Sequence, residues 1–374
     1  MKTIIIGLAA FSLVTGIAQA QDDPLPDSVA RAYLAYEQAV EAGDTATATE
    51  TARSAWQAAR DERIDAGLIG ILAENYATLA QAAGENDEAY AAWRNAAEIS
   101  DRLEAPESER ATGWYNAGVA AFANGALLDA NTALIRSARH QGDVSSGADL
   151  ELLGMTHYLI AASSARLGQL RGLGEHAGAA IAAFQTSDRA FDSIYADAYY
   201  LLGISDYARA RFEESVADFN MARGVLTAAG LEGREGDIDV FSSWILLAQS
   251  NLNSAQQTRS DAQLAASQFP PEVDETIQTP QGENNQDAGQ LRRAAPRYPR
   301  EAEQRGREGV VLVRFGVDAQ GRTEDIEIVA AIPTGIFEAA SVEAVRRWHY
   351  QPAVSDGQAV PRRGIETAFV FKMR

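Results

Sequence analysis

Residues 311–329 read VLVRFGVDAQGRTEDIEIV, and their alternation decides the fold of the last part of the chain. The large apolar residues Val311, Val313 and Phe315 recur at every second position, which is the period of a strand rather than of a helix. Asp-Ala-Gln-Gly follows with the composition of a turn, and a second strand is expected at 324–329. The stretch therefore predicts a β-hairpin.

The sequence after this hairpin changes to helical spacing and then returns to the strand period. Apolar residues that share one helical face are Phe337, Ala340, Val345 and Trp348. The helix is expected to end near Tyr350, because Pro352 disfavours helical angles at the residue before it. A last strand is expected at 365–371, where large side chains alternate again. The order strand, strand, helix, strand predicts a small α+β domain.

The preceding part of the chain, from about residue 27 to 266, has the pattern of paired helices that repeat. Small and large residues recur at Tyr36, Ala48, Ala52, Ala55; at Ala77, Ala89, Trp93, Ala96; at Trp114, Ala117, Gly118, Ala130, Leu134, Ser137; at Ser164, Leu167, Gly168, Ala180, Phe184; and at Tyr199, Leu202, Gly203, Ser215, Phe219, Ala222. This spacing is similar to that of tetratricopeptide repeats, although the intervals of 41, 41, 50 and 35 residues between the units are irregular. The pattern predicts an all-α solenoid of about five hairpins, closed by a helix over about 237–267.

A proline- and amide-rich stretch separates the two parts. It begins at Phe269-Pro270-Pro271 and contains few large apolar residues, which is typical of a linker. We therefore expect a helical-repeat domain over 21–268, a linker over 269–291 and the α+β domain over 292–374.

The first twenty residues have a short positive start, an apolar middle and Ala-Gln-Ala at the end, as a secretory signal has. Cleavage is expected before Gln21. The alternative is an uncleaved membrane anchor, since residues 3–20 approach the length that crosses a bilayer.

Charge and composition exclude several functions. The chain carries a net charge of −20, with +3 on residues 291–374 and −23 on the rest. Such an acidic chain repels nucleic acid and anionic lipid, so neither is an expected partner. There is no cysteine, and the four histidines are too scattered for a metal site. The sequence contains no motif of a catalytic serine or threonine nucleophile and no dinucleotide-binding loop. We therefore expect no enzyme activity, cofactor or metal.

The last domain has a set of widely separated prolines, glycines and aromatic residues, which includes Pro296, Tyr298, Pro299, Ala302, Gly306, Gly309, Phe315, Gly321, Phe337, Ala344, Trp348, Tyr350, Pro352 and the closing Phe369 and Phe371. In order and spacing these positions resemble the C-terminal domain of the TonB family. The resemblance implies a three-stranded antiparallel sheet with one helix, in which Trp348 and Tyr350 lie on the helix and belong to the core. His349 is expected on the surface of that helix.

The resemblance also implies a binding mode. In the family, an extended peptide of an outer-membrane transporter, the TonB box, adds to the sheet along its last strand. The corresponding edge is Gly364, Ile365, Glu366, Thr367, Ala368, Phe369, Val370 and Phe371. A homodimer partner or the linker could occupy that edge instead. Family members that drive transport have a glutamine where this chain has Ala295, which puts one polar contact to the box in question.

Three functional hypotheses follow. The first is an exported, periplasmic, non-enzymatic adaptor that binds one protein on its helical repeats and a TonB-dependent transporter, or another periplasmic protein, by strand addition. The second is an inner-membrane-anchored energy transducer, which would contact the proton-driven motor. The third is an envelope scaffold whose last domain binds peptidoglycan or dimerises.

Overall fold

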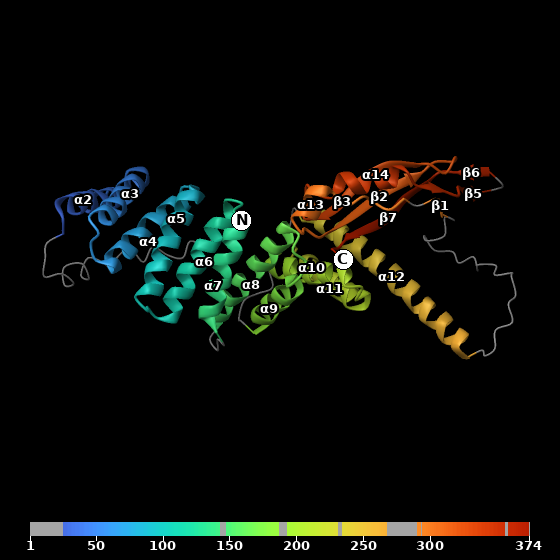
Figure 1. Cartoon of the computed structure of the whole chain (residues 1–374), viewed down its shortest axis with the longest axis horizontal. Coiled ribbons are helices and arrows are strands. Elements are labelled where there is room, and N and C mark those ends of the chain that lie inside the picture. The colour runs from blue at the N-terminus through green and yellow to red at the C-terminus, as the bar shows by residue number, and fades with distance from the viewer. Residues whose placement is uncertain are drawn as a thin grey trace. The chain divides into compact units, whose positions relative to one another are not determined.

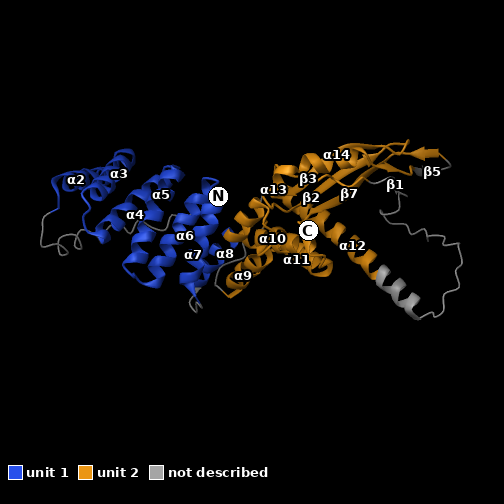
Figure 2. Cartoon of the chain, viewed as in Figure 1, with its two compact units in different colours: residues 1–159 blue, residues 160–374 orange. Residues whose placement is uncertain are grey.

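The computed structural model describes residues 25–142, 147–186, 193–230, 234–267, 290–292, 294–355 and 358–373. The chain divides into two compact units, residues 1–159 and 160–374 (Figure 2), with the boundary inside one helix. The expected signal at 1–20 and most of the expected linker, 268–289, lie outside the described residues. Within the described ranges, no helix combines the length and the apolar character that a membrane crossing requires.

The first unit consists of helical hairpins, as the repeats predict (Figure 1). Its described helices are α2 (Asp27–Glu41), α3 (Thr45–Asp61), α4 (Ala66–Ala82), α5 (Asn86–Arg102), α6 (Glu107–Ala123), α7 (Leu127–Gln141) and the start of α8 (Gly147–Leu167). The turns inside the three hairpins contain Gly43, Gly84 and Gly125, all with positive φ and spaced 41 residues apart. The repeat interval found in the sequence is therefore the interval of the turns.

The second unit contains a helical stack of its own and ends in the sheet domain. Its remaining helices of the stack are α9 (Leu173–Thr186), α10 (Ser193–Ala208), α11 (Phe212–Ala229) and α12 (Glu235–Ser267). Helix contacts confirm the hairpins α2/α3, α4/α5, α6/α7 and α10/α11 in the described part of the chain, with α8 and α9 between the last two and α12 as a final single helix. A Cβ on Gly203 would lie 2.7 Å from the ring of Phe219, so the small residue lets α10 approach α11 closely.

The fourth repeat unit differs from the others at Gly168. α8 ends at Leu167, and Gly168 follows it with φ of +69°. The N–H of Gln169 donates to the carbonyl of Ser164 at 2.9 Å, which closes the helix end in the way that a C-terminal glycine favours. The helix stops here, so the Leu-Gly pair does not have its usual place in a hairpin.

The C-terminal domain contains a three-stranded antiparallel sheet of order β3-β2-β7. Its elements are β1 (Gln290–Arg292), α13 (Arg300–Gln304), β2 (Gly309–Val317), β3 (Thr323–Ile332), α14 (Glu338–Arg346), β4 (His349–Tyr350), β5 (Ala353–Ser355), β6 (Gln358–Val360) and β7 (Arg362–Phe371). β1 pairs with β4 and β5 with β6. The expected hairpin, helix and last strand are thus present, and the α+β fold is confirmed.

The expected end of the helix was wrong. α14 ends at Arg346, and Trp348 and Tyr350 lie beyond it, the latter in β4. The N–H of Tyr350 donates to the carbonyl of Gly321 at 2.8 Å, which ties the chain to the hairpin turn and prevents another helical turn. His349 therefore lies in a short strand, partly buried, rather than on a helix surface.

The central strand β2 is buried on both of its faces. On one face Val311, Val313 and Phe315 of β2 pack with Trp348 and Tyr350 in the domain core. Both rings are buried, as expected. The other face of β2 carries Val310 and Leu312, which are also fully buried. The sheet is therefore covered on the side opposite α14 as well.

Candidate functional site

β7 is an edge strand of the sheet. It pairs antiparallel with β2 along its length, from Gly309 opposite Phe371 to Val317 opposite Arg362. Among the described residues, no strand pairs with the outer side of β7. All eight residues of the expected edge, Gly364 to Phe371, lie in this strand.

The side chains of β7 alternate between a buried and an open face. Thr367, Phe369 and Phe371 are buried toward the domain core, and Ile365 is half-buried on the same side. Gly364 and Val370 on the other face are exposed, whereas Glu366 and Ala368 are half-buried. The fixed inner face sets the register of β7, so its outer backbone edge is held in one position.

Aromatic rings of the motif residues hold the end of β7. Phe371 stacks on Phe337 at 4.4 Å between ring centroids and meets Tyr298 edge-on at 5.7 Å. Trp348 contacts Phe369 at 5.4 Å. The Tyr298 hydroxyl donates to the carbonyl of Arg307. Burial raises the pKa of Tyr298, and Glu308 and Glu303 raise it further, so the phenol stays protonated.

A second group of motif residues sets the path of the backbone. The Trp348 Nε1–H donates to the carbonyl of Ala294 at 2.7 Å and fixes the segment that precedes α13. Half-buried Pro296 lies in that segment, and Pro299 caps α13. Gly306 follows α13 with positive φ, and a Cβ on Gly309 would lie 2.5 Å from the Phe337 ring. Half-buried Pro352 follows β4.

The turn of the β2–β3 hairpin is fixed by Asp318. Its carboxylate accepts the N–H groups of Gln320 and Arg322, both at 2.9 Å. The hydrogen bond from the Arg322 N–H lowers the pKa of Asp318. Together with Gly321, this side chain accounts for the Asp-Ala-Gln-Gly composition of the turn.

Sequence reasoning missed a polar cluster on the face of the sheet away from the domain core. Arg314 of β2 and Glu366 of β7 lie opposite each other, with Nη2 and Oε1 at 2.8 Å. Ser243 of α12 donates to the same Oε1 at 3.0 Å, and Arg314 Nη2 lies 3.2 Å from its Oγ. Arg314, a charged residue within the apolar sequence of β2, was the signal that the sequence offered. Its partners could be identified only from the pairing of β2 with β7 and from the position of α12.

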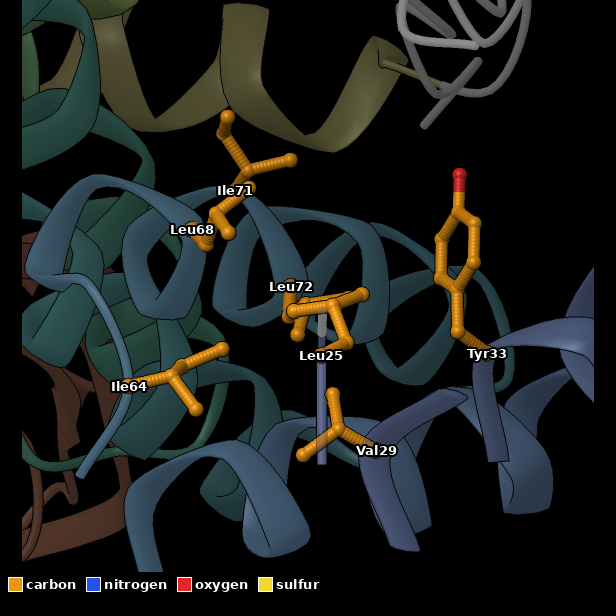
Figure 3. A pocket seen from close by; sticks show the side chains of 7 residues that line it. All are labelled: Leu25, Val29, Tyr33, Ile64, Leu68, Ile71 and Leu72. Carbon is orange, nitrogen blue, oxygen red and sulfur yellow. The ribbon is translucent and has the colours of Figure 1, made fainter. Parts of the chain in front are cut away.

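The remaining polar clusters and cavities of the described residues lie away from this edge. Within the described ranges, no group of three or more His, Asp and Glu residues is placed to hold a metal ion. A pocket between α2 and α4 is lined by Leu25, Val29, Tyr33, Ile64, Leu68, Ile71 and Leu72 (Figure 3). Its single polar group is the Tyr33 hydroxyl, whose pKa is raised to about 12 by burial and by Glu37. This pocket supplies apolar contact only.

Comparison with known proteins identifies the last domain. Residues 294–373 match the family model described as Gram-negative bacterial TonB protein C-terminal. The TonB protein of Pseudomonas aeruginosa is 37% identical over 90 residues, which are 24% of this chain and 26% of that protein. The chain thus spans about a quarter of the length of this relative. The resemblance stated from the sequence is confirmed for this domain.

Two solved structures are similar to parts of the chain. A solution structure of the Pseudomonas aeruginosa TonB C-terminal domain is 37% identical, covers 22% of this chain and 84% of its own, and has a TM-score of 0.21. A kinesin light chain fragment with nearly identical TPR-like repeats, from Podospora anserina, is 14% identical. It covers 55% of this chain and 99% of its own with a TM-score of 0.40.

Proposed function

We propose that the C-terminal domain binds an extended peptide by strand addition at the outer edge of β7. The observation that carries this proposal is an edge strand whose inner face is fixed by Phe369 and Phe371, while its outer side pairs with no described strand. A peptide strand added there would gain main-chain hydrogen bonds along β7. By the TonB-like character of the domain, the peptide would be the TonB box of an outer-membrane transporter.

The helical repeats would bind a second protein, which makes the chain an exported, non-enzymatic adaptor in the periplasm. Glu74 of α4 and Glu109 of α6 lie on the first helices of adjacent hairpins. Both side chains are exposed, and crowding by neighbouring groups together with the charge of Glu109 raises the pKa of Glu74. A basic segment of a partner would relieve this repulsion, and the net charge of −23 outside residues 291–374 favours the same class of partner.

Proline substitution in β7 tests strand addition. In an antiparallel pair, alternate residues direct their N–H groups to the partner strand and to the open edge, so one of the neighbours Thr367 and Ala368 faces outward. Thr367→Pro and Ala368→Pro are compared by calorimetric titration with a TonB-box peptide from a transporter of the same cell. A scrambled peptide is the control.

We expect one variant to keep its thermal stability and lose peptide affinity, and the other to destabilise the domain, since proline is tolerated only at an edge position that lacks a ladder bond. Failure of the box peptide to bind the unmodified protein, or equal binding by both proline variants, would contradict strand addition.

The anchored energy transducer is the alternative, and residues 1–20 distinguish it. The intact mass of the protein from soluble and membrane fractions is the measurement. A soluble species that begins at Gln21 supports the adaptor. A membrane-bound species that retains residues 1–20 supports the transducer, with the repeats between anchor and β7. Binding to purified sacculi would indicate the scaffold instead.

A further inference from the structure

The face of the sheet opposite α14 is in contact with the helical stack of the same unit. α12 lies against β7, and Figure 1 shows α12 and α14 on opposite sides of the sheet. The N–H of Glu308 donates to the carbonyl of Gly168 at 2.9 Å, so the end of α8 meets the start of β2 as well. These contacts are consistent with the complete burial of Val310 and Leu312.

The contact between α12 and β7 is specific in its polar groups. Ser243 is buried, and its Oγ contacts both members of the Arg314–Glu366 ion pair. The next residue of α12, Trp244, points in a different direction and stacks on Phe219 of the helical stack at 5.7 Å. α12 is therefore held by the repeats and by the edge strand.

An apolar surface remains open beside this contact. Leu246 lies one helical turn after Ser243, and its side chain is 64% exposed. A side chain directed under the sheet would be buried, so Leu246 is directed toward solvent rather than toward the underside of the sheet. Val370 lies on the same face of β7 as Glu366 and is 39% exposed. Both exposed apolar side chains belong to elements that meet at the Ser243–Glu366 contact.

We propose that α12 forms one wall of the peptide site, so that the strand added to β7 carries apolar side chains toward Leu246 and Val370. This inference rests on the proposed strand addition and specifies its ligand. The peptide would present its apolar residues at every second position on the α12 side, while its main chain pairs with β7. The Ser243–Glu366 contact has a positioning role, because it holds α12 beside the edge.

Leu246→Ser tests the wall directly. Leu128 on α7 is 65% exposed, in the first unit, so Leu128→Ser is a control of the same chemistry and exposure. The probe is the TonB-box peptide, titrated into the full chain. We expect Leu246→Ser to weaken binding about fivefold, as loss of a partly buried leucine contact does, and Leu128→Ser to leave it unchanged.

Cross-linking tests the position of α12 without a ligand, because the chain has no cysteine of its own. Ser243→Cys combined with Glu366→Cys should be joined rapidly by a short bismaleimide. The control pair combines Ser243→Cys with Glu327→Cys, on the opposite edge strand and in the same row across Arg314. It should react more slowly, since Ser243 contacts Glu366 directly, whereas Glu327 lies one strand spacing, about 5 Å, beyond Arg314.

The outcomes separate the two proposals. If the peptide binds the unmodified protein but Leu246→Ser binds as tightly as Leu128→Ser, the wall is wrong and strand addition stands. If the two cysteine pairs react equally, α12 does not lie on β7 and the wall is again wrong. If the cross-linked protein loses peptide binding, α12 covers the edge rather than lining it. Absence of any peptide binding overturns strand addition and the wall together.

Discussion

The carbonyl oxygen of Tyr350 lies 2.1 Å from the place that a Cβ would occupy on Gly321. The two residues also share a main-chain hydrogen bond, from the Tyr350 N–H to the Gly321 carbonyl at 2.8 Å. The glycine of the hairpin turn therefore contacts the tyrosine that follows α14, although the two residues are far apart in the sequence. It brings Tyr350 into the core beside Phe315, with ring centroids 5.7 Å apart.

Replacement of Gly321 by alanine should destabilise the C-terminal domain strongly. The new Cβ would meet the backbone of Tyr350, and φ of +84° is strained for alanine. We expect a loss of about 3 kcal/mol in the free energy of unfolding. Gly335→Ala is the matched control, since φ is +80° there but no atom lies within 4 Å of its Cβ, and about 1 kcal/mol should be lost. Urea denaturation measures both, and equal losses would show that the Tyr350 contact is unimportant.

Substitutions at two glycines should test the close approach of α10 and α11. Gly203→Ala would push a methyl group into the Phe219 ring, 2.7 Å away, and we expect a loss of about 2 kcal/mol. Gly224→Ala on α11 has nothing within 4 Å and should stabilise by about 0.5–1 kcal/mol, because alanine favours the helix. Thermal unfolding followed by circular dichroism compares the two. Changes of the same sign would contradict the packing role of Gly203.

Removal of the indole N–H of Trp348 should weaken the attachment of the segment before α13. Trp348→Phe keeps an aromatic ring against Phe315 and Phe369 but leaves the carbonyl of Ala294 without its donor. We expect a loss of about 1–3 kcal/mol, together with faster hydrogen exchange in residues 294–307. Trp93→Phe is the control, because Trp93 donates to the side chain of Gln81. Without this donor, the Gln81 side chain can rotate and accept a hydrogen bond from water. Unchanged exchange in 294–307 would contradict the proposed role.

The spacing of apolar residues predicted the helices and strands, because buried side chains recur once per turn of a helix and at every second residue of a strand. The alternation of β2 and of β7, and the 41-residue interval of the first hairpins, are consequences of this kind. The boundaries were less predictable. Nothing local to Trp348 and Tyr350 shows that the chain leaves the helix at Arg346, because the competing partner of the backbone is Gly321, in a distant turn.

The candidate site was predictable in part for the same reason. The edge strand could be located, since its core-facing residues alternate with outward ones. The Arg314–Glu366–Ser243 cluster could not, because it joins three elements whose register depends on tertiary packing. The domain limits expected from the sequence stay predictions. Contact of α12 with β7 places the last helix of the stack and the sheet in the same compact unit.

Asp218 of α11 should make the stability of the second unit depend on pH. Burial raises the pKa of Asp218 to about 7, and the charge of Asp206 contributes in the same direction. Its Oδ2 is buried and has no hydrogen-bond partner among the described residues. In the unfolded chain an aspartate has a pKa of about 3.9. Between about pH 4 and 7 the folded state therefore binds more protons than the unfolded chain, so the free energy of unfolding falls as the pH rises through this window.

Asp218→Asn keeps the shape of the side chain and cannot ionise, so it should remove this dependence. Relative to the unmodified protein, we expect the variant to gain about 1–2 kcal/mol in the free energy of unfolding between pH 4 and pH 8, because no charge is buried at the higher pH. Glu213→Gln is the control, since Glu213 lies on the same helix with an exposed side chain and should leave the pH profile unchanged. Urea denaturation at half-unit steps of pH gives the two profiles. Parallel profiles of Asp218→Asn and the unmodified protein from pH 4 to 8 would show that the Asp218 carboxyl does not titrate in this window. The unpaired Oδ2 of Asp218 would then have no effect on the free energy of unfolding.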